Sequence, residues 1–375
     1  MMDFKLSDEQ EMLRTGLNKF LATRYGLDRS RAAAKTGAGW QPDVWRAFAD
    51  DLGILGAALP ERVGGSGGGP VEVMVIAESL GHALVVEPYV DTAVVAAGLL
   101  LRAGGQAATQ VVERIAAGQA VVSLAAAEEQ SGDRWLDVAT TAHRDGTGWA
   151  LSGAKMMVLG APIATHLLIT ARTDNGVSLF LVDVAAVERG LETHDLRTVD
   201  DRRAADLVLD DLRLPGDALL GEEGQAWPSL AQARDEGAAA VCAEAVGAMR
   251  RVVADTVDYA KQRHQFGQPI GSFQALQHRM VDMHMELEQS AAAVYLATLN
   301  LGADPATRAR AVSAAKATIG RAARFVGQNA VQLHGGMGMT EELAIGHYFK
   351  RLTAVQYEFG STDHHIARYA RLTRK

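Results

Sequence analysis

The spacing of apolar and polar residues changes twice along the chain. Up to about residue 118 the apolar residues recur at helical spacing, and this spacing returns from about residue 226. Between these parts the apolar runs are short, rich in branched residues and separated by turn residues. We therefore predict an α+β multidomain protein: an N-terminal helical domain over 1–118, a middle antiparallel β-barrel or sandwich domain over 119–225, and a C-terminal helical domain over 226–375.

Local signals mark several helix starts and one turn in the N-terminal part. Ser7 and Gln10 have the spacing of a capping box, and Gln41–Asp43 places a proline in a first helical turn. The segment Pro60–Pro70 is too rich in glycine for regular structure, so we expect a turn. Its Gly65–Gly67 lacks the Gly-Lys-Ser/Thr ending of a phosphate loop and follows no clear strand.

Two dipeptides in the middle part, Asp145-Gly146 and Asn175-Gly176, predict β-hairpins, because type I′ turns need positive φ at both central positions. We expect the last strand near Ala205–Asp210, since a Pro-Gly pair soon breaks the pattern. The other predicted strands include Trp149–Ser152, His166–Arg172 and Val177–Val182.

The C-terminal part carries a strong helical pattern. Asp304-Pro305 predicts the start of one helix, and Thr340–Glu342 predicts the start of another after a break at His334–Met339. One face of an earlier helix is marked by apolar residues at spacings of three, four and seven: Leu276, Met280, Met283, Leu287 and Val294.

Composition narrows the function classes. The chain is 48% hydrophobic and 22% charged, as in ordinary globular proteins, and its net charge of −8 argues against nucleic-acid binding. The single cysteine, Cys242, excludes an internal disulfide framework, and its alanine-rich surroundings predict a small buried thiol. We see no secretory signal and no apolar run long enough for a membrane span, so we expect a cytoplasmic protein that does not bind membranes.

Two common catalytic arrangements are not supported by the sequence. Adjacent His364 and His365 point about 100° apart on a helix, so they do not readily chelate one metal ion. No His-Glu-x-x-His spacing occurs, and Gly64–Gly68, although it fits Gly-x-Ser-x-Gly, follows no clear strand and is therefore not read as a nucleophile elbow. We therefore expect no metal site.

Two segments are more informative when they are taken together. The first reads Tyr259-Ala-x-x-Arg263-x-Gln-Phe266-Gly-x-Pro-Ile, followed by Phe-Gln274-x-x-Gln, and the second reads Gln332-x-x-Gly-Gly-x-Gly338. Taken singly, Arg263 suits a helix C-terminus and the glycines suit a tight turn. In this order and spacing, however, the segments resemble the acyl-CoA dehydrogenase family over essentially the whole chain.

The resemblance implies a helical domain, a β-barrel domain and a C-terminal four-helix bundle, with FAD bound near a subunit interface and a tetramer expected. It implies that Arg263 meets the FAD pyrophosphate of a neighbouring subunit. The rest of that cofactor's path would be lined by Phe266, Gln274, Gln332, Gly335 and Gly336. Guanidinium is a strong bidentate phosphate partner, and glycine lets backbone approach a ligand closely.

The family reaction converts an acyl-CoA substrate to a 2-enoyl-CoA: a carboxylate removes the α-proton while the β-hydrogen leaves as hydride to the flavin. An electron-transfer flavoprotein is the implied electron acceptor. One family pattern puts the base directly before Gly-Thr near the C-terminus. Here ungapped counting puts Phe359 at that position, and Glu358 reaches it only after a one-residue shift.

Another family pattern puts the base on the helix that precedes Arg263. The equivalent position lies close to Gly237, so Asp235 and Glu236 are also candidates. The alternative interpretation is an acid that stabilises the first turn of a helix. The barrel also departs from the family pattern at Ala127–Asp133 and Met156–Leu159, segments that normally hold or touch the isoalloxazine.

Within the family the chain most resembles the small subunit of pimeloyl-CoA dehydrogenase and related heteromeric enzymes. We therefore expect a homologous larger partner. A self-sufficient homo-oligomeric dehydrogenase, an oxidase and a flavin-free structural subunit stay as alternatives. The segments that carry this resemblance are Cys242–Met249, Gly271–His278, Gly346–Leu352 and Phe359–His365.

Overall fold

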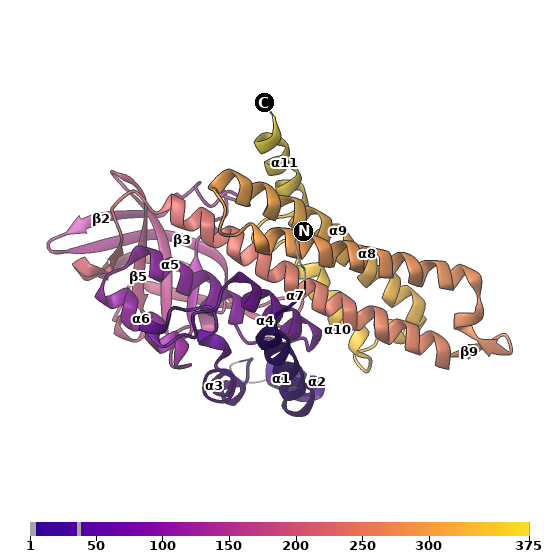
Figure 1. Cartoon of the computed structure of the whole chain (residues 1–375). Helices are drawn as coiled ribbons and strands as arrows, with labels where there is room; N and C mark the ends of the chain where they lie inside the picture. Colours follow the sequence, from indigo (N-terminus) through magenta and orange to yellow (C-terminus); the bar gives the residue numbers. More distant parts are fainter. Residues whose placement is uncertain (1–4, 36–38, 375) are drawn as a thin grey trace. The chain divides into compact units, whose positions relative to one another are not determined.

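The computed structural model describes residues 5–35 and 39–374 (Figure 1). The chain packs into two compact units, each assembled from separate segments. One unit comprises Met1–Arg29, Pro70–Val85 and Ala238–Lys375, and the other comprises Ser30–Gly69 and Val86–Gly237. The predicted boundaries at residues 118 and 225 stay a prediction.

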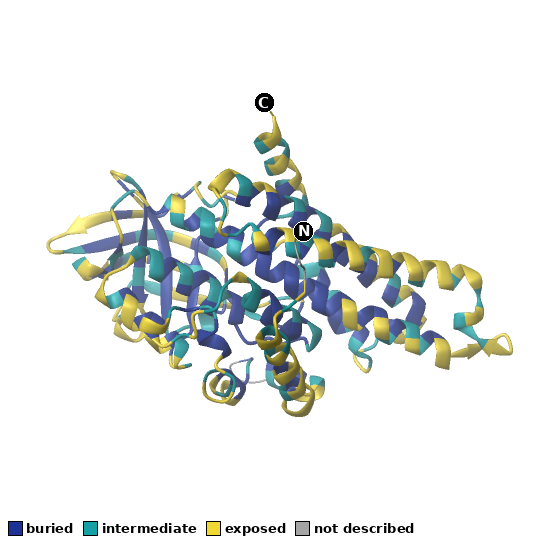
Figure 2. Cartoon of the chain, in the orientation of Figure 1, coloured by how far each residue is buried: buried dark blue, intermediate teal, exposed yellow. Residues whose placement is uncertain are grey.

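The first unit is helical. Its core is rich in alanine, which lets helix backbones approach closely, and α9 contributes buried residues along its whole length. Figure 2 shows α8 with one buried and one exposed side. The helices are α1 (Asp8–Arg24), α4 (Pro70–His82), α7 (Trp227–Gln262, of which the part from Ala238 belongs here), α8 (Gln274–Leu299), α9 (Pro305–His334), α10 (Ala344–Ala354) and α11 (Thr362–Thr373).

The second unit is built on an eight-stranded sheet of order β6-β7-β3-β2-β4-β5-β8, with β1 paired to β4. Trp149 and Phe180 meet edge to face in its core, with ring centroids 5.2 Å apart. The strands are β1 (Val122–Ala125), β2 (Thr141–Asp145), β3 (Gly148–Leu159), β4 (His166–Thr173), β5 (Gly176–Asp183), β6 (Leu191–Arg197), β7 (Arg203–Leu214) and β8 (Leu219–Leu220).

Helical segments complete the second unit. They are α2 (Leu27–Lys35), which starts in the first unit, α3 (Pro42–Asp50), a π-helical turn (Val90–Ala96), α5 (Ala97–Ala103) and α6 (Gln106–Ala116). The glycine-rich segment after Pro60 contains only a 3₁₀ turn, Glu61–Val63, and Gly65 is required there because an added Cβ would lie 2.1 Å from the Leu59 carbonyl oxygen. The prediction of a turn in this segment is confirmed.

Several local predictions are confirmed. The capping box is present, since the Ser7 hydroxyl accepts from the Gln10 amide at 3.3 Å and the Gln10 side chain accepts from the Ser7 amide at 3.0 Å. The Asp304 carboxylate caps α9, and the predicted apolar face of α8 packs into the core. Cys242 is fully buried, and burial raises the pKa of its thiol to about 12.

Other predictions are wrong in detail. α10 begins at Ala344 rather than at Thr340, because the Thr340 hydroxyl donates to the Met337 carbonyl oxygen instead of capping a helix. Both hairpins form, but their loops are Gly146-Thr147 and Asp174-Asn175, one residue earlier or later than the favoured turn positions. The sheet is not purely antiparallel, because β1 runs parallel to β4, and β8 follows the strand predicted to be last.

Candidate functional site

One end of the helical unit gathers the residues for which a cofactor role is implied. The Tyr259 ring stacks on His334 with centroids 4.3 Å apart, and its hydroxyl donates to the His334 carbonyl oxygen at 3.4 Å. This contact joins the C-terminal ends of α7 and α9. Arg263 and Gly335 follow directly, and antiparallel packing of α8 against α9 brings Gln274 to the same end.

A short hairpin, β9 (His264–Gln265) and β10 (Gln268–Pro269), connects α7 to α8 at this end (Figure 1). Phe266 lies at its tip with φ 56° and is 91% exposed, and its ring meets Phe273 edge to face at 6.0 Å. A large apolar side chain held in solvent on a left-handed backbone is costly unless another surface covers it.

The glycines after α9 meet different structural requirements. Gly335 has φ 60°, which favours glycine, whereas an added Cβ at Gly336 would meet no atom within 4 Å. Gly338 is sterically required, because its Cβ would lie 2.7 Å from the Val331 carbonyl oxygen. The open side of Gly335 and Gly336 leaves exposed backbone against which a ligand can lie.

This end of the bundle fits an anionic cofactor group. Arg263 is exposed, and α8 begins without a side-chain cap, so its first amides and the positive end of its dipole face outward. Gln332 is exposed in the last turn of α9. The structure thus brings the six implied residues to one exposed end, where they would hold the pyrophosphate-bearing part of FAD.

Glu358 lies in the turn between α10 and α11, in a buried ion cluster. Arg351 donates from Nη2 to Glu358 at 2.9 Å, and its Nη1 makes a second, shorter contact with the same carboxylate. The other side of Arg351 binds Glu244, at 2.7 Å from Nε and 3.0 Å from Nη2. The side chains of Arg351 and Glu358 are 3% and 12% exposed, so this carboxylate is held inward by a buried cation.

Hydrogen bonds from a buried lysine also hold the backbone of the turn between α10 and α11. The buried ammonium group of Lys316 donates to the carbonyl oxygens of Val355, Gln356 and Gly360 at 2.8, 3.2 and 3.0 Å. His365 contacts the Phe359 carbonyl oxygen at 3.1 Å, and burial, together with Lys316, lowers the pKa of His365 to about 2. The neutral ring therefore supports a turn in which Phe359 has φ 56°.

Asp235 and Glu236 occupy the second unit and do not lie in a first helical turn, since α7 begins at Trp227. That interpretation is therefore wrong. Asp235 is fully buried. Glu236 accepts through Oε1 from Arg102 Nη1 and from Gln232 Nε2, both at 2.9 Å, while its Oε2 is buried and accepts no hydrogen bond within the described ranges.

The divergent segment Ala127–Asp133 is tied to β3 by a buried ion pair. Lys155 Nζ donates to Glu128 at 2.5 Å and to the Thr170 hydroxyl at 2.9 Å. Burial opposes ionisation of Glu128, but hydrogen bonds from Lys155 and Gln130 outweigh it and lower the pKa of Glu128 to about 2. Burial lowers the pKa of Lys155 to about 8, so both groups are charged at neutral pH.

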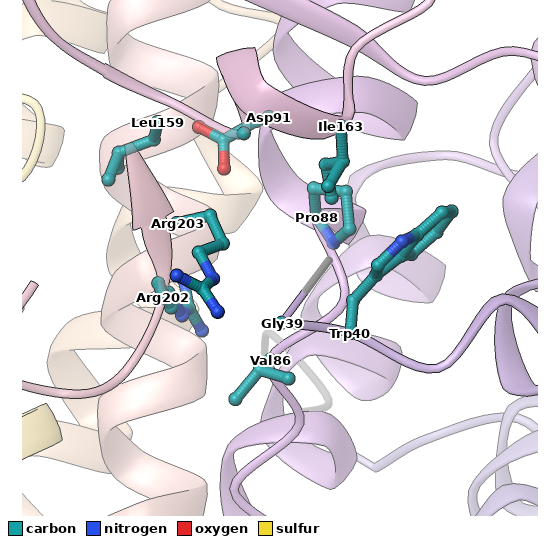
Figure 3. Close-up of a pocket in the computed structure, with 10 residues that line it drawn as sticks. Gly39, Trp40, Val86, Pro88, Asp91, Leu159, Ile163, Arg202 and Arg203 are labelled. Carbon is teal, nitrogen blue, oxygen red and sulfur yellow. The ribbon is translucent and has the colours of Figure 1, made fainter. Parts of the chain in front are cut away.

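A small cavity lies at the end of β3, beside Leu159. Its walls include Arg203, which extends toward Gly39, and Asp91, whereas Trp40 points away from the gap (Figure 3). The cavity holds about 20 Å³, room for about one water molecule rather than for an organic ring. Met157 lies in the other divergent segment, Met156–Leu159. Its φ is 51° and its side chain is 50% exposed.

The sequence gives no indication that several residues in the contacts described above have a structural role. Lys316, Glu244 and His334 lie within alanine-rich helices, where an isolated polar residue gives no indication of its partner. Their partners are distant along the chain, as in the Arg351–Glu244 pair. In the described part of the chain no group of three or more His, Cys, Asp or Glu side chains has a metal-binding arrangement. No described helix is long and apolar enough to cross a membrane.

Along the chain a helical part is followed by a β part and a second helical part, and the six residues with an implied cofactor role lie at one end of the last part. Models of the acyl-CoA dehydrogenase N-terminal, middle and C-terminal domains match residues 7–127, 123–212 and 224–372. Acyl-CoA dehydrogenase FadE12 of Mycobacterium tuberculosis is 30% identical over 90% of this chain and 89% of its own length. The chain therefore belongs to the acyl-CoA dehydrogenase family, and the predicted fold is confirmed.

Two solved structures are similar over nearly their whole length. A variant of the Tcur3481-Tcur3483 steroid ACAD aligns with a TM-score of 0.88 and 28% identity, covering 97% of each chain. The ChsE4-ChsE5 complex from Mycobacterium tuberculosis aligns with a TM-score of 0.89 and 26% identity, covering 99% of this chain and 98% of that chain. The family typically binds FAD.

Proposed function

We propose that this chain is one subunit of a heteromeric, FAD-dependent acyl-CoA dehydrogenase, and that a homologous larger subunit supplies the catalytic base. One observation carries the proposal: Glu358, the candidate base nearest the family position, is bound by Arg351 inside a buried cluster. A carboxylate paired to a buried guanidinium is a poor proton acceptor, because taking up a proton leaves the cation without its partner.

The proposed reaction is the desaturation of an acyl-CoA to a 2-enoyl-CoA. Bound FAD supplies the hydride acceptor for the β-hydrogen. This chain contributes the cation Arg263, the amides at the start of α8, and the open backbone at Gly335 and Gly336. These groups bind and orient the pyrophosphate end of a cofactor whose reacting ring lies in the partner. Electron-transfer flavoprotein is the proposed electron acceptor.

The relatives support a divided enzyme and a bulky substrate. The solved relatives include a complex named for two components, ChsE4 and ChsE5, and an ACAD described as acting on steroids. We extend the proposal to acyl chains that are bulky or carry a second functional group, such as sterol-derived or dicarboxylic acyl-CoAs.

One observation favours a second candidate, a self-sufficient homo-oligomeric enzyme. Glu236 keeps a buried oxygen, Oε2, that accepts no hydrogen bond from any residue in the described ranges. A carboxyl oxygen of this kind is available to a proton. In this candidate Glu236 is the base and Arg102 positions it through the 2.9 Å hydrogen bond.

The test begins with purification of the chain alone and together with its homologous partner, followed by visible spectra and anaerobic titration with an acyl-CoA. We expect flavin absorbance and substrate bleaching only for the pair. A yellow chain that bleaches without a partner contradicts the heteromer. A colourless pair supports a flavin-free structural subunit, and rapid turnover with oxygen alone supports an oxidase.

Variants of the pair then locate the base. Glu358→Gln and Asp235→Asn are expected to keep the bleaching rate within about threefold, whereas loss of a true base costs about 100-fold or more. Glu236→Gln separates the two candidates, because a loss of that size supports the self-sufficient mechanism. The folded state of each variant is checked by its thermal midpoint, since Glu358 and Asp235 are buried or nearly so.

A further inference from the structure

A polar pocket of about 430 Å³ lies in the helical unit, between α1, α4 and α7. Its size is within the range of small-molecule sites and far above the space of a few waters. Apart from Gly247, the residues that line it carry polar or charged side chains. A pocket of this size lined by polar and charged side chains is better suited to a hydrophilic ligand than to an acyl chain.

The walls of the pocket are rigid because α4 and α7 cross in backbone contact. An added Cβ at Gly247 would lie 1.8 Å from the Glu78 carbonyl oxygen, and one at Gly81 would lie 1.9 Å from the Glu244 carbonyl oxygen. The third wall, α1, is tied to α4 by a 2.8 Å hydrogen bond from Gln10 to Glu72. The polar groups are therefore held in place before any ligand binds.

Four neutral side chains of the pocket have unused hydrogen-bonding capacity. Thr15 and Asn18 come from α1, and Ser79 and His82 come from α4. Within the described ranges none of these side chains forms a hydrogen bond with another residue. Ser79 is only 4% exposed, so its hydroxyl faces the pocket without the alternative of full hydration.

The charged residues of the pocket favour an anion. Arg14 and Arg250 contribute two guanidinium groups, and Glu78 is the one lining carboxylate. Glu78 is already engaged by Arg250 Nε at 3.0 Å, which leaves the two terminal nitrogens of that guanidinium to point elsewhere. Arg14 likewise binds Glu11 through a single nitrogen, Nη2, at 2.5 Å.

His82 adds a neutral donor and acceptor to this set. Burial lowers the pKa of His82, and the positive charges of Arg251 and Arg250 lower it further, against the opposite effects of Asp255 and Glu78. The ring is therefore neutral at pH 7 and offers one N–H and one lone pair.

We propose that this polar pocket binds a small molecule carrying a phosphate or pyrophosphate group. Two arginines on different helices provide the charge-assisted hydrogen bonds such a group needs, and the hydroxyl and amide groups provide neutral donors. The site is separate from the cofactor end, since Arg250 lies 13 residues before Arg263, about 20 Å along one helix. It goes beyond the proposed dehydrogenase function and does not depend on it.

The test is calorimetric titration of the full-length protein with sodium pyrophosphate, at constant ionic strength set with chloride. We expect one saturable site per chain beyond any at the cofactor end. Arg250→Gln and Asn18→Ala are expected to weaken binding, the first by about tenfold or more because a charge-assisted bond is lost. Arg321→Gln, at an exposed arginine of α9 that does not line the pocket, is the control and is expected to bind within about twofold of wild type.

Glu78→Gln is expected to change the pyrophosphate affinity in the opposite direction. It removes the one carboxylate and releases Arg250, so pyrophosphate should bind more tightly, whereas a purely structural role predicts weaker binding in both variants. Arg263→Gln separates the pocket from the cofactor end. The proposal is overturned if pyrophosphate gives no saturable heat, if Arg321→Gln weakens binding as much as Arg250→Gln, or if Arg263→Gln alone abolishes binding.

Discussion

Arg351 joins two carboxylates in a part of the bundle that is closed to water. Replacing it by methionine removes the guanidinium that binds the carboxylates of Glu244 and Glu358, so we expect Arg351→Met to lower the free energy of unfolding by about 3–5 kcal/mol. Urea denaturation at pH 7 measures this.

The matched control for Arg351 is Arg250→Met, which breaks an ion pair whose two side chains are 46% and 28% exposed. We expect that change to cost about 1 kcal/mol or less. Equal losses from the two substitutions would mean that the Arg351 cluster is not a buried charge network, and would return Glu358 to the set of available bases.

Glu128 gives the sheet a specific sensitivity to acid. Its folded-state pKa of about 2 lies below its ordinary value of 4.5, so its ionised form stabilises the fold above about pH 4.5 and the contribution is lost as the pH falls toward 2. We expect Glu128→Gln to cost about 2 kcal/mol at pH 6, with the difference from wild type narrowing toward pH 2. Urea midpoints at several pH values measure it, with exposed Glu129→Gln as a control that should show no such convergence.

The pairing of Glu358 with Arg351 could not be predicted from the sequence. Counting positions identifies Phe359 at the family base position and leaves Glu358 one residue away, but it gives no indication that Glu358 is engaged by Arg351. That pairing depends on a turn whose carbonyl groups bind Lys316, some 40 residues earlier. Contacts of this separation leave no local pattern.

Among the elements, the crossing of α4 and α7 depends on two glycines. We expect Gly247→Ala to destabilise the protein by about 2–3 kcal/mol or more, because its Cβ would lie 1.8 Å from the Glu78 carbonyl oxygen and the helices must separate. Gly16→Ala is the control: it is also in a helix interior, its Cβ meets nothing within 4 Å, and it should stabilise the protein by up to about 1 kcal/mol. Thermal midpoints of both variants test this, and a stabilised Gly247→Ala would contradict it.

Element positions follow from the sequence where the determining contacts are local. The capping box at Ser7 and the proline start of α9 are set within a few residues, and both are confirmed. The start of α10 and the registers of the two hairpins depend on packing and pairing instead, and there the local signal is wrong. Gly81 and Gly247 show no periodic signal, because each is required by a backbone far away in sequence.

At the scale of the molecule, α8 carries large apolar side chains that the described residues leave exposed. Val281, Met285 and Leu296 are 55%, 53% and 48% exposed. We expect a subunit interface there, so that Met285→Lys with Leu296→Lys reduces the oligomer mass measured by light scattering. Met12→Lys, at a residue 71% exposed on α1, is expected to leave the mass unchanged. An unchanged mass in the double variant would place the interface elsewhere.

The cofactor end of the bundle gives the last prediction, which concerns the whole assembly. If this chain holds the pyrophosphate of FAD for a neighbouring subunit, Arg263→Gln should lower the flavin content of the purified pair, with about tenfold weaker FAD affinity from the lost charge-assisted bonds. Lys261→Gln is the control, because it removes the same charge at the same helix end from a side chain that is 69% exposed and paired with Asp258. The ratio of flavin to protein absorbance measures both. Equal loss of flavin in Arg263→Gln and Lys261→Gln would show that only general positive charge matters here, and equal full retention would remove this chain from the flavin site.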